Sequence, residues 1–264
     1  MKKKIENDEL KQIQLDILDN VASFCESKNI NYFLAYGTLI GAIRHKGYIP
    51  WDDDIDIAMP RPDYQRFMDL YNKEDSNYKM ICYELNEEYN LPFGKVTDIR
   101  TDMIEGMYQE HHNYGVYIDV FPIDGFQNKR VMFQAQWLRR ALNAKLAVIG
   151  KGRGVLGDMK IVVGKIALSF VSVKHILFKI NKLCMTYQYD KCNKVGYIPT
   201  LSLSRSGIVE KKLIDTTLKG EFEGRTFRIP IGYDLYLKQI YGDYMQLPPK
   251  EKQVTHHTFQ AWWK

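Results

Sequence analysis

The stretch DDDIDIAM at residues 52–59 limits the fold more than any other part of this 264-residue chain, because charged and apolar side chains alternate along it. Successive residues of a β-strand point to opposite faces, so the pattern predicts a half-buried strand over 54–59 with Ile55 and Ile57 in the core. The stretch contains four aspartates within five positions, Asp52, Asp53, Asp54 and Asp56. Like charges this close repel one another, so we expect a positive group among them.

Asp54 and Asp56 lie two residues apart and are therefore expected on one face of the predicted strand, with Asp52 in the same parity. Carboxylates held side by side suit Mg²⁺ or Mn²⁺, hard cations that take oxygen ligands and share them with phosphates. A calcium-binding loop is excluded, because its sixth position would be Ile57 in place of glycine and its twelfth Asp63 in place of glutamate. A solvated acidic turn is the alternative interpretation, and the flanking core residues favour the metal.

The aspartates follow a strand, a Gly-Thr turn and a helix, in that order. The segment INYFLAY (30–36) predicts a short buried strand, and Gly37 and Thr38 open a helix that runs to about Arg44. Gly37 lets the backbone approach a phosphate, and the amides at the start of the helix can donate hydrogen bonds to it. This order of elements, with Asp-x-Asp on the next strand, is typical of nucleotidyltransferase-type phosphoryl-transfer sites.

A two-metal site normally has a third carboxylate from a neighbouring strand. The candidates are Asp98, Asp119 and Asp124. Asp119 is our first choice, because it lies within a predicted strand between Ile118 and Val120, where an unpaired carboxylate would be costly. A hydrogen-bonded aspartate at the end of a turn is the alternative for Asp119, and Asp124 has the character of a turn residue.

The remaining sequence predicts an α+β fold. Apolar residues at helical spacing predict a helix over 8–28, and Pro62 is well placed to start a helix that runs to about Tyr71. Further strands are expected at 78–84, 93–99, 103–109 and 116–121.

Three regions follow from this pattern. Residues 1–127 form a mixed sheet core flanked by helices, and residues 128–200 form an additional mainly helical region. Residues 201–264 are expected to pack back on the core.

Net charge and hydropathy limit the classes of molecule that the chain is expected to bind. The net charge of +5 suits phosphate-bearing partners, and the absence of a nucleic-acid-binding motif predicts that nucleic acid is not among them. The most apolar window, 161–180, is interrupted by Lys165, Lys174 and Lys179, which predicts a buried or interfacial helix rather than a membrane span. For the basic, apolar part from 139 to 182, a membrane-surface platform and a helical core with lysines at its rim both stay open.

The cysteines and the N-terminus bear on location. The N-terminal residues lack the apolar region and the cleavage site of a signal peptide. The four cysteines have irregular spacings without a CxxC pair, which argues against a disulfide framework and a zinc ribbon. We therefore expect reduced cysteines and a cytoplasmic location.

The segment GTLIGAIRHKGYIPWDDDIDIAMPR resembles the signature of the LicD family, the phosphocholine transferases that decorate bacterial cell-surface glycans. The resemblance extends to KVTDIRT, to IDVFPIDG and to FEGRTFRIPIGYDLYLKQIYGDYMQLPPKEK. It implies a nucleotidyltransferase-like core and transfer of a phospho-alcohol, typically phosphocholine from CDP-choline, to a sugar hydroxyl, with release of CMP. It also implies a teichoic-acid or other glycan precursor as acceptor, usually lipid-linked and modified in the cytoplasm at the inner face of the membrane. Relatives that transfer ribitol phosphate share the acidic motif, so the alcohol stays open.

The resemblance also implies roles for particular residues. Asp54 and Asp56, with Asp52 and Asp119 in support, would hold one or two Mg²⁺ or Mn²⁺ ions across the pyrophosphate, and Asp119 is also a candidate general base. Gly37 and Thr38 would lie at the donor phosphates.

Basic and aromatic side chains would complete the donor site. Arg44 and Lys95 are the nearest basic candidates. Trp51 either packs against the aspartate loop or stacks on the cytosine. The resemblance further suggests that His256 returns to the site. Two other functions remain open: a nucleotidyltransferase that adds NMP to a small acceptor, and a non-catalytic module that binds choline or glycan.

Overall fold

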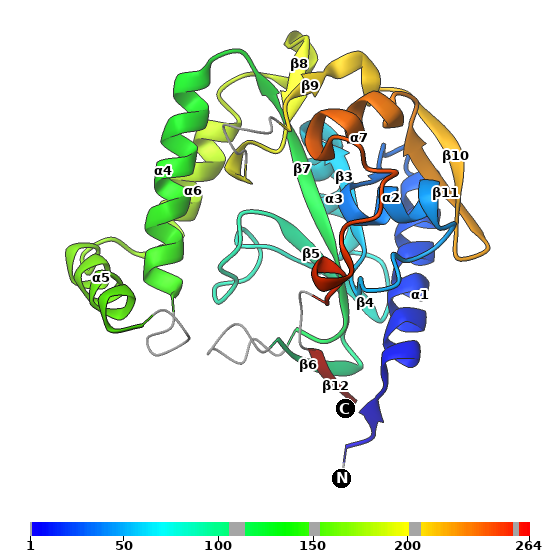
Figure 1. Cartoon of the computed structure of the whole chain (residues 1–264), viewed down its shortest axis with the longest axis horizontal. Helices are drawn as coiled ribbons and strands as arrows, with labels where there is room; N and C mark the ends of the chain where they lie inside the picture. The colour runs from blue at the N-terminus through cyan, green and yellow to red at the C-terminus, as the bar shows by residue number, and fades with distance from the viewer. Residues whose placement is uncertain (1, 106–113, 148–153, 201–206, 256–258) are drawn as a thin grey trace.

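The structure is a computed structural model that describes residues 2–105, 114–147, 154–200, 207–255 and 259–264. Its centre is a mixed sheet with the strand order β2–β3–β7–β5–β4 (Figure 1). The bounds are Phe33–Leu34 (β2), Asp56–Pro60 (β3), Tyr117–Phe126 (β7), Gly94–Asp98 (β5) and Tyr78–Ile81 (β4). Strands β3 and β7 are parallel, whereas the other neighbours in this order are antiparallel. The predicted α+β class is confirmed.

Three helices of the first half lie where the apolar spacing predicts them. Their bounds are Asn7–Ser27 (α1), Tyr36–Arg44 (α2) and Arg61–Tyr71 (α3). Helix α1 buries a stripe that includes Leu10, Ile17 and Val21 and contacts β5 and β7, so it covers the centre of the sheet. Pro62 occupies the first turn of α3, where its missing N–H costs nothing.

The C-terminal part lies against the first half of the chain. Strands β10 (Thr217–Phe222) and β11 (Arg225–Pro230) form a hairpin, and β11 contacts β2. Helix α7 (Tyr233–Tyr241) contacts α2. Strand β12 (Phe259–Trp263) pairs with both β1 (Lys4–Ile5) and β6 (Thr101–Glu105), so the two ends of the chain meet in one small sheet.

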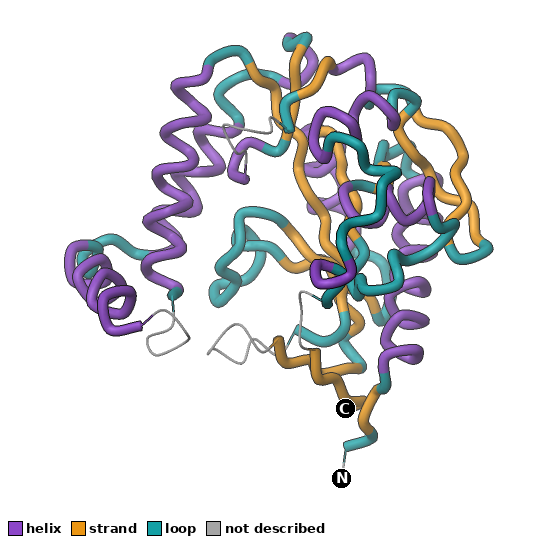
Figure 2. The backbone as a smooth tube through the Cα atoms, viewed as in Figure 1, coloured by secondary structure: helices purple, strands orange, loops and turns teal. Residues whose placement is uncertain are grey.

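The mainly helical region begins after β7. Its helices are α4 (Lys129–Leu146), α5 (Gly154–Ala167) and α6 (Val173–Cys184) (Figure 2). Helices α4 and α6 share a second hydrophobic cluster, and the chain returns to the sheet through β8 (Lys194–Gly196), which pairs with β7 and with β9 (Val209–Glu210).

The apolar window 161–180 is divided between two helices, where the sequence predicted one. Ser172 caps the second of them, because its hydroxyl accepts a hydrogen bond from the His175 N–H at 3.1 Å. Among the described residues, no helix is both long and apolar enough to cross a membrane.

Candidate active site

Three of the predicted site residues lie side by side across the central sheet. Asp56 of β3 is in register with Asp119 of β7, and Asp119 is in register with Lys95 of β5. Residues opposite one another on neighbouring strands share a face, so the three side chains form a row, here called the Asp56–Asp119–Lys95 row. Within it, the Lys95 Nζ donates a hydrogen bond to the Asp119 Oδ1 at 2.6 Å.

The Lys95–Asp119 ion pair is buried. The two side chains are 5% and 13% exposed, and the Lys95 Nζ also lies 3.4 Å from the centroid of the Tyr117 ring. A buried charge is tolerated when it is paired, so Lys95 allows a carboxylate to occupy this position within β7. The pair fixes the Asp119 carboxylate beside Asp56.

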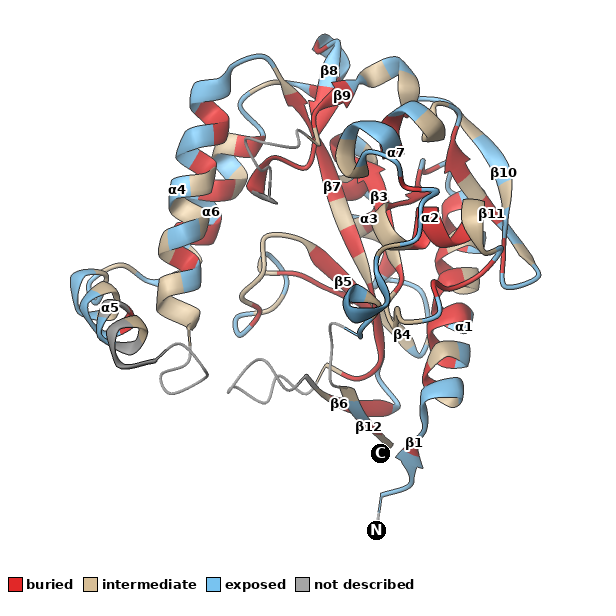
Figure 3. Ribbon diagram, in the orientation of Figure 1, coloured by how far each residue is buried: buried red, intermediate tan, exposed pale blue. Residues whose placement is uncertain are grey.

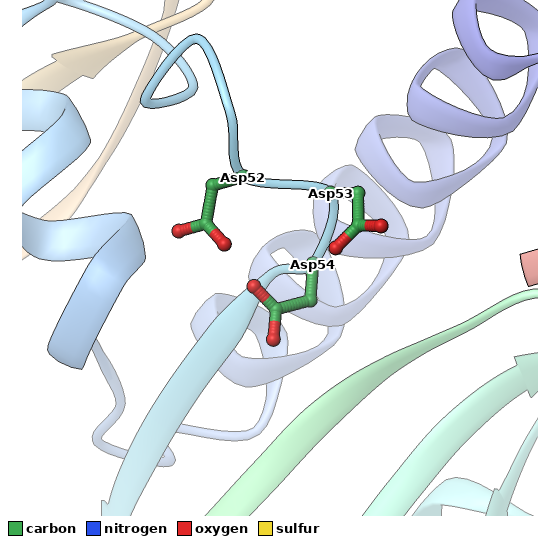
Figure 4. A group of neighbouring side chains, drawn as sticks. All are labelled: Asp52, Asp53 and Asp54. Atoms are coloured by element: carbon green, nitrogen blue, oxygen red, sulfur yellow. The ribbon is translucent and has the colours of Figure 1, made fainter. Parts of the chain in front are cut away.

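The other aspartates lie on the loop that leads into β3 (Figure 4). One carboxylate oxygen from each of Asp52, Asp53 and Asp54 lies within 4.8 Å of the others, and we call these three residues the acid cluster. Strand β3 begins at Asp56, so Asp54 lies in the loop, and the prediction that the strand begins at residue 54 is wrong. Aspartate is unfavourable in strands, and a run of three therefore delays the start of the strand. Asp53, which the parity argument left out, belongs to the cluster.

The electrostatics of Asp56 show that the loop and the row converge. Burial raises the pKa of the Asp56 carboxyl well above its ordinary value. The negative charges of Asp54, Asp119 and Asp52 raise this pKa further, whereas Lys95 lowers it. A divalent cation between these carboxylates would remove the repulsion, and a donor set made only of carboxylate oxygens fits Mg²⁺ or Mn²⁺.

The start of α2 positions both groups of aspartates. The Thr38 hydroxyl is buried and accepts a hydrogen bond from the Asp56 N–H at 2.8 Å. A Cβ atom at Gly37 would lie 2.6 Å from the Asp52 Oδ2, so any other residue here would displace this carboxylate. Tyr36, directly before, has a φ of 46°, a backbone conformation that residues other than glycine adopt at a cost.

Three further predicted residues have different surroundings. The Arg44 guanidinium donates hydrogen bonds to the Tyr244 carbonyl and to the His45 Nε2, which ties α2 to the C-terminal part. Trp51 packs against the main core, with its ring edge-to-face to His45 at 6.4 Å between centroids. His256 lies outside the described residues.

An aromatic group that the sequence reasoning missed lies beside the row. It consists of Tyr36, Phe93, Phe121 and Tyr197. Phe121 follows Asp119 by two residues and Phe93 precedes Lys95 by two, so strand parity places both on the face of the row. The centroid of the Phe121 ring lies 4.5 Å from Phe93, 5.1 Å from Tyr36 and 5.1 Å from Tyr197.

The alternation of side chains along a strand could have indicated Phe93 and Phe121, since each lies two residues from a predicted site residue, Lys95 or Asp119. No sequence signal pointed to Tyr197, which directly follows strand β8.

Arg139 of α4 is a second basic group that the sequence reasoning did not single out. Its Nη1 is buried without a hydrogen-bond partner among the described residues, and so is the Tyr197 hydroxyl. Burial raises the pKa of Tyr197, and the positive charge of Arg139 opposes this rise, so the two groups lie near one another. Buried donors without partners are costly, and an anion would satisfy both.

A known protein family matches the part of the chain that carries these carboxylates. The family model described as "LicD/FKTN/FKRP, nucleotidyltransferase domain" matches residues 29–147, which include the acid cluster and the Asp56–Asp119–Lys95 row. The α+β fold and its carboxylate-lined site thus define a nucleotidyltransferase-type domain.

Whole-chain similarity gives the family. The lipopolysaccharide cholinephosphotransferase LicD of Haemophilus influenzae is 34% identical over 273 residues, which cover 98% of this chain and 99% of that protein. An uncharacterized protein of Rickettsia prowazekii is 54% identical over 24% of this chain and 23% of its own length. Another, of Rickettsia typhi, is 39% identical over 22% of this chain and 17% of its own length. The chain belongs to the LicD family, as the sequence resemblance predicted.

Proposed function

We propose that the chain transfers phosphocholine from CDP-choline to a sugar hydroxyl of a cell-surface glycan precursor, with CMP as the leaving group. The observation that carries the proposal is the 34% identity, over 98% of the chain, to a lipopolysaccharide cholinephosphotransferase. The acid cluster and the Asp56–Asp119–Lys95 row supply the charged groups that such a transfer requires.

In the proposed reaction the acceptor oxygen forms a bond to the phosphorus of phosphocholine, and the P–O bond to CMP breaks. Asp52, Asp54 and Asp56, with Asp53 as a further donor, would hold Mg²⁺ or Mn²⁺, and the bound ion would neutralise charge that develops on the pyrophosphate. The hydrogen bond from the Asp56 N–H to the Thr38 hydroxyl fixes the start of β3 against α2, and Gly37 of the same helix lies against the Asp52 carboxylate.

Asp119 has two proposed roles. Its register with Asp56 supports a role in completing the metal site, and it is also the candidate base for the proton of the acceptor hydroxyl. Lys95 fixes the position of the Asp119 carboxylate through the 2.6 Å hydrogen bond, and a fixed position serves either role.

The donor phosphates and the nucleotide would lie between the acid cluster on one side and Arg139 and Tyr197 on the other. Arg139 and Tyr197 offer buried donors without partners, which suit a phosphate oxygen. The backbone at Gly37 approaches the acid cluster closely enough to face the same phosphates. Arg44, Trp51 and His256 remain proposed donor contacts, and the edge-to-face contact of Trp51 with His45 supports packing as its first role.

The aromatic group supports choline over a polyol as the transferred alcohol. A quaternary ammonium binds to the faces of aromatic rings and takes no hydrogen bonds, whereas ribitol or glycerol requires hydrogen-bonding partners. Tyr36, Phe93 and Phe121 are partly exposed beside Asp119, so ring surface is available at the transfer site.

Family membership supports a proposal for the acceptor and the cellular location. The Haemophilus relative is named for lipopolysaccharide, and we propose a lipopolysaccharide, teichoic acid or similar glycan precursor, carried on a lipid and modified in the cytoplasm at the inner face of the membrane.

The matching family model describes a nucleotidyltransferase domain, and this favours one other reaction, addition of NMP to a small acceptor. In that case the nucleotide would stay on the acceptor and would not be released as CMP.

A donor panel tests the proposal. The purified protein, Mg²⁺ and a lipid-linked glycan fraction would be incubated with CDP-choline, CDP-ethanolamine, CDP-glycerol or CDP-ribitol, and CMP release would be measured. We expect release from CDP-choline above the others. Release from a different donor would overturn the choline assignment, and turnover of nucleoside triphosphates alone would establish the nucleotidyltransferase reaction.

A further inference from the structure

Exposed residues alternate with buried ones along helices α4 and α6 (Figure 3), and several of the exposed residues have large apolar side chains. Trp137 is 65% exposed, Phe178 is 56% exposed and Phe133 is 47% exposed. Trp137 and Phe178 line one groove of ≈ 920 Å³ between the two helices, together with Leu138 and Met185. Apolar surface of this kind on a folded domain normally marks a contact with another molecule or a lipid phase.

The same surface is strongly basic. Helices α4 and α6 together carry eight lysines and arginines and no acidic residue, although the net charge of the whole chain is only +5. Lys179 and Lys182 line the groove beside the aromatic side chains. The rest of the chain is therefore net acidic. One of the eight, Arg139, has its Nη1 buried near Tyr197 at the candidate active site and is not part of this surface.

Lysine snorkelling and self-association fit this surface less well than a lipid contact does. Lysines that snorkel at the rim of a helical core would cover the apolar side chains with their stems, whereas Trp137 and Phe178 remain more than half exposed. Pairing with a second copy would bring two surfaces of the same positive charge together, and such contacts are unfavourable.

We propose that the α4–α6 surface, defined by Phe133, Trp137, Phe178, Lys179 and Lys182, docks on an anionic lipid bilayer. The aromatic side chains lie at the boundary between headgroups and acyl chains, and the lysines lie at lipid phosphates, as in other interfacial amphipathic helices. Helix α5 and the following turn add exposed apolar groups, with Ile166 67% and Phe170 100% exposed. The docking holds the enzyme where a lipid-linked acceptor would be found, but it does not depend on the identity of the reaction.

Vesicle binding of the full chain tests the proposal. Sedimentation with vesicles of phosphatidylcholine alone and of phosphatidylcholine with phosphatidylglycerol would be compared for the unchanged chain, Trp137→Gln/Phe178→Gln, and Lys179→Gln/Lys182→Gln. We expect binding to the anionic vesicles only, weakened at least about tenfold by either double substitution and reduced by salt. Leu218→Gln, at a 44% exposed leucine on β10, is the matched control and should bind like the unchanged chain.

Thermal unfolding and light scattering complete the test. All changed side chains are exposed, so the melting temperatures should agree and any loss of binding reports on the surface itself. Equal binding to neutral vesicles, or no effect of either double substitution, would overturn the proposal. A dimer that Trp137→Gln/Phe178→Gln dissolves would assign the surface to self-association instead. A failure of CMP release with vesicle binding intact would bear on the proposed reaction alone.

Discussion

Replacement of Lys95 by methionine should destabilise the protein far more than an ordinary Lys→Met change. Methionine keeps much of the length and apolar volume of the side chain, but it removes the positive charge that pairs with the buried Asp119 carboxylate beside Asp56. Breaking a buried ion pair by removing one charge costs about 3 to 5 kcal/mol, since the other charge stays uncompensated. We expect a loss of that size in the free energy of unfolding for Lys95→Met, and less than about 0.5 kcal/mol for the exposed control Lys219→Met.

A double-mutant cycle separates this pair from general disruption of the core. Asp119→Asn alone leaves Lys95 unpaired, and Lys95→Met/Asp119→Asn removes both charges. The double variant should therefore lose clearly less stability than the sum of the two single variants, with a coupling of at least about 2 kcal/mol in urea unfolding. Losses under about 1 kcal/mol for Lys95→Met, or additive losses within about 0.5 kcal/mol, would refute the buried pair.

Three more predictions concern the site. Gly37→Ala should improve helix propensity yet displace the Asp52 carboxylate, because the new Cβ would lie 2.6 Å from its Oδ2. Titration with Mn²⁺ should show at least about tenfold weaker binding without loss of stability. An unchanged Mn²⁺ affinity would contradict the contact between Gly37 and Asp52. Phe121→Ala should weaken CDP-choline binding about fivefold to thirtyfold in calorimetry while CDP binding stays the same, whereas equal weakening of both would exclude a choline contact. Arg139→Gln should raise the KM for CDP-choline about tenfold or more, and an unchanged KM would remove Arg139 from the donor site.

The sequence predicted the elements best where a strong period coincided with clear ends. The helices α1, α2 and α3 begin and end within about two residues of the predicted bounds, because each has a buried stripe and a terminating loop. The strand carrying Asp56 begins two residues later than the alternation predicts, because a run of three aspartates is unfavourable in a strand.

Contacts between segments that lie far apart in the sequence could not be predicted from local sequence patterns. The small sheet in which β12 joins β1 and β6 brings together residues from both ends of the chain, and neither end has a signal for its partner. For the same reason the ion pair of Asp119 with Lys95 was not predicted, although both residues were singled out. The contact of Gly37 with Asp52 and the hydrogen bond from Asp56 to Thr38 likewise depend on packing between elements.

Metal-dependent CMP release tests the central claim most directly, because it joins the acid cluster to the chemistry. The unchanged chain, Asp54→Ala, Asp56→Ala and the control Asp69→Ala, on helix α3, would be compared with CDP-choline and a lipid-linked glycan fraction, with Mg²⁺ and with a chelator. The account predicts Mg²⁺-dependent release that both site variants lose at least about a hundredfold while keeping their far-UV spectra, and that the control retains. Near-normal release by Asp54→Ala and Asp56→Ala, or equal release in the presence of the chelator, would contradict it.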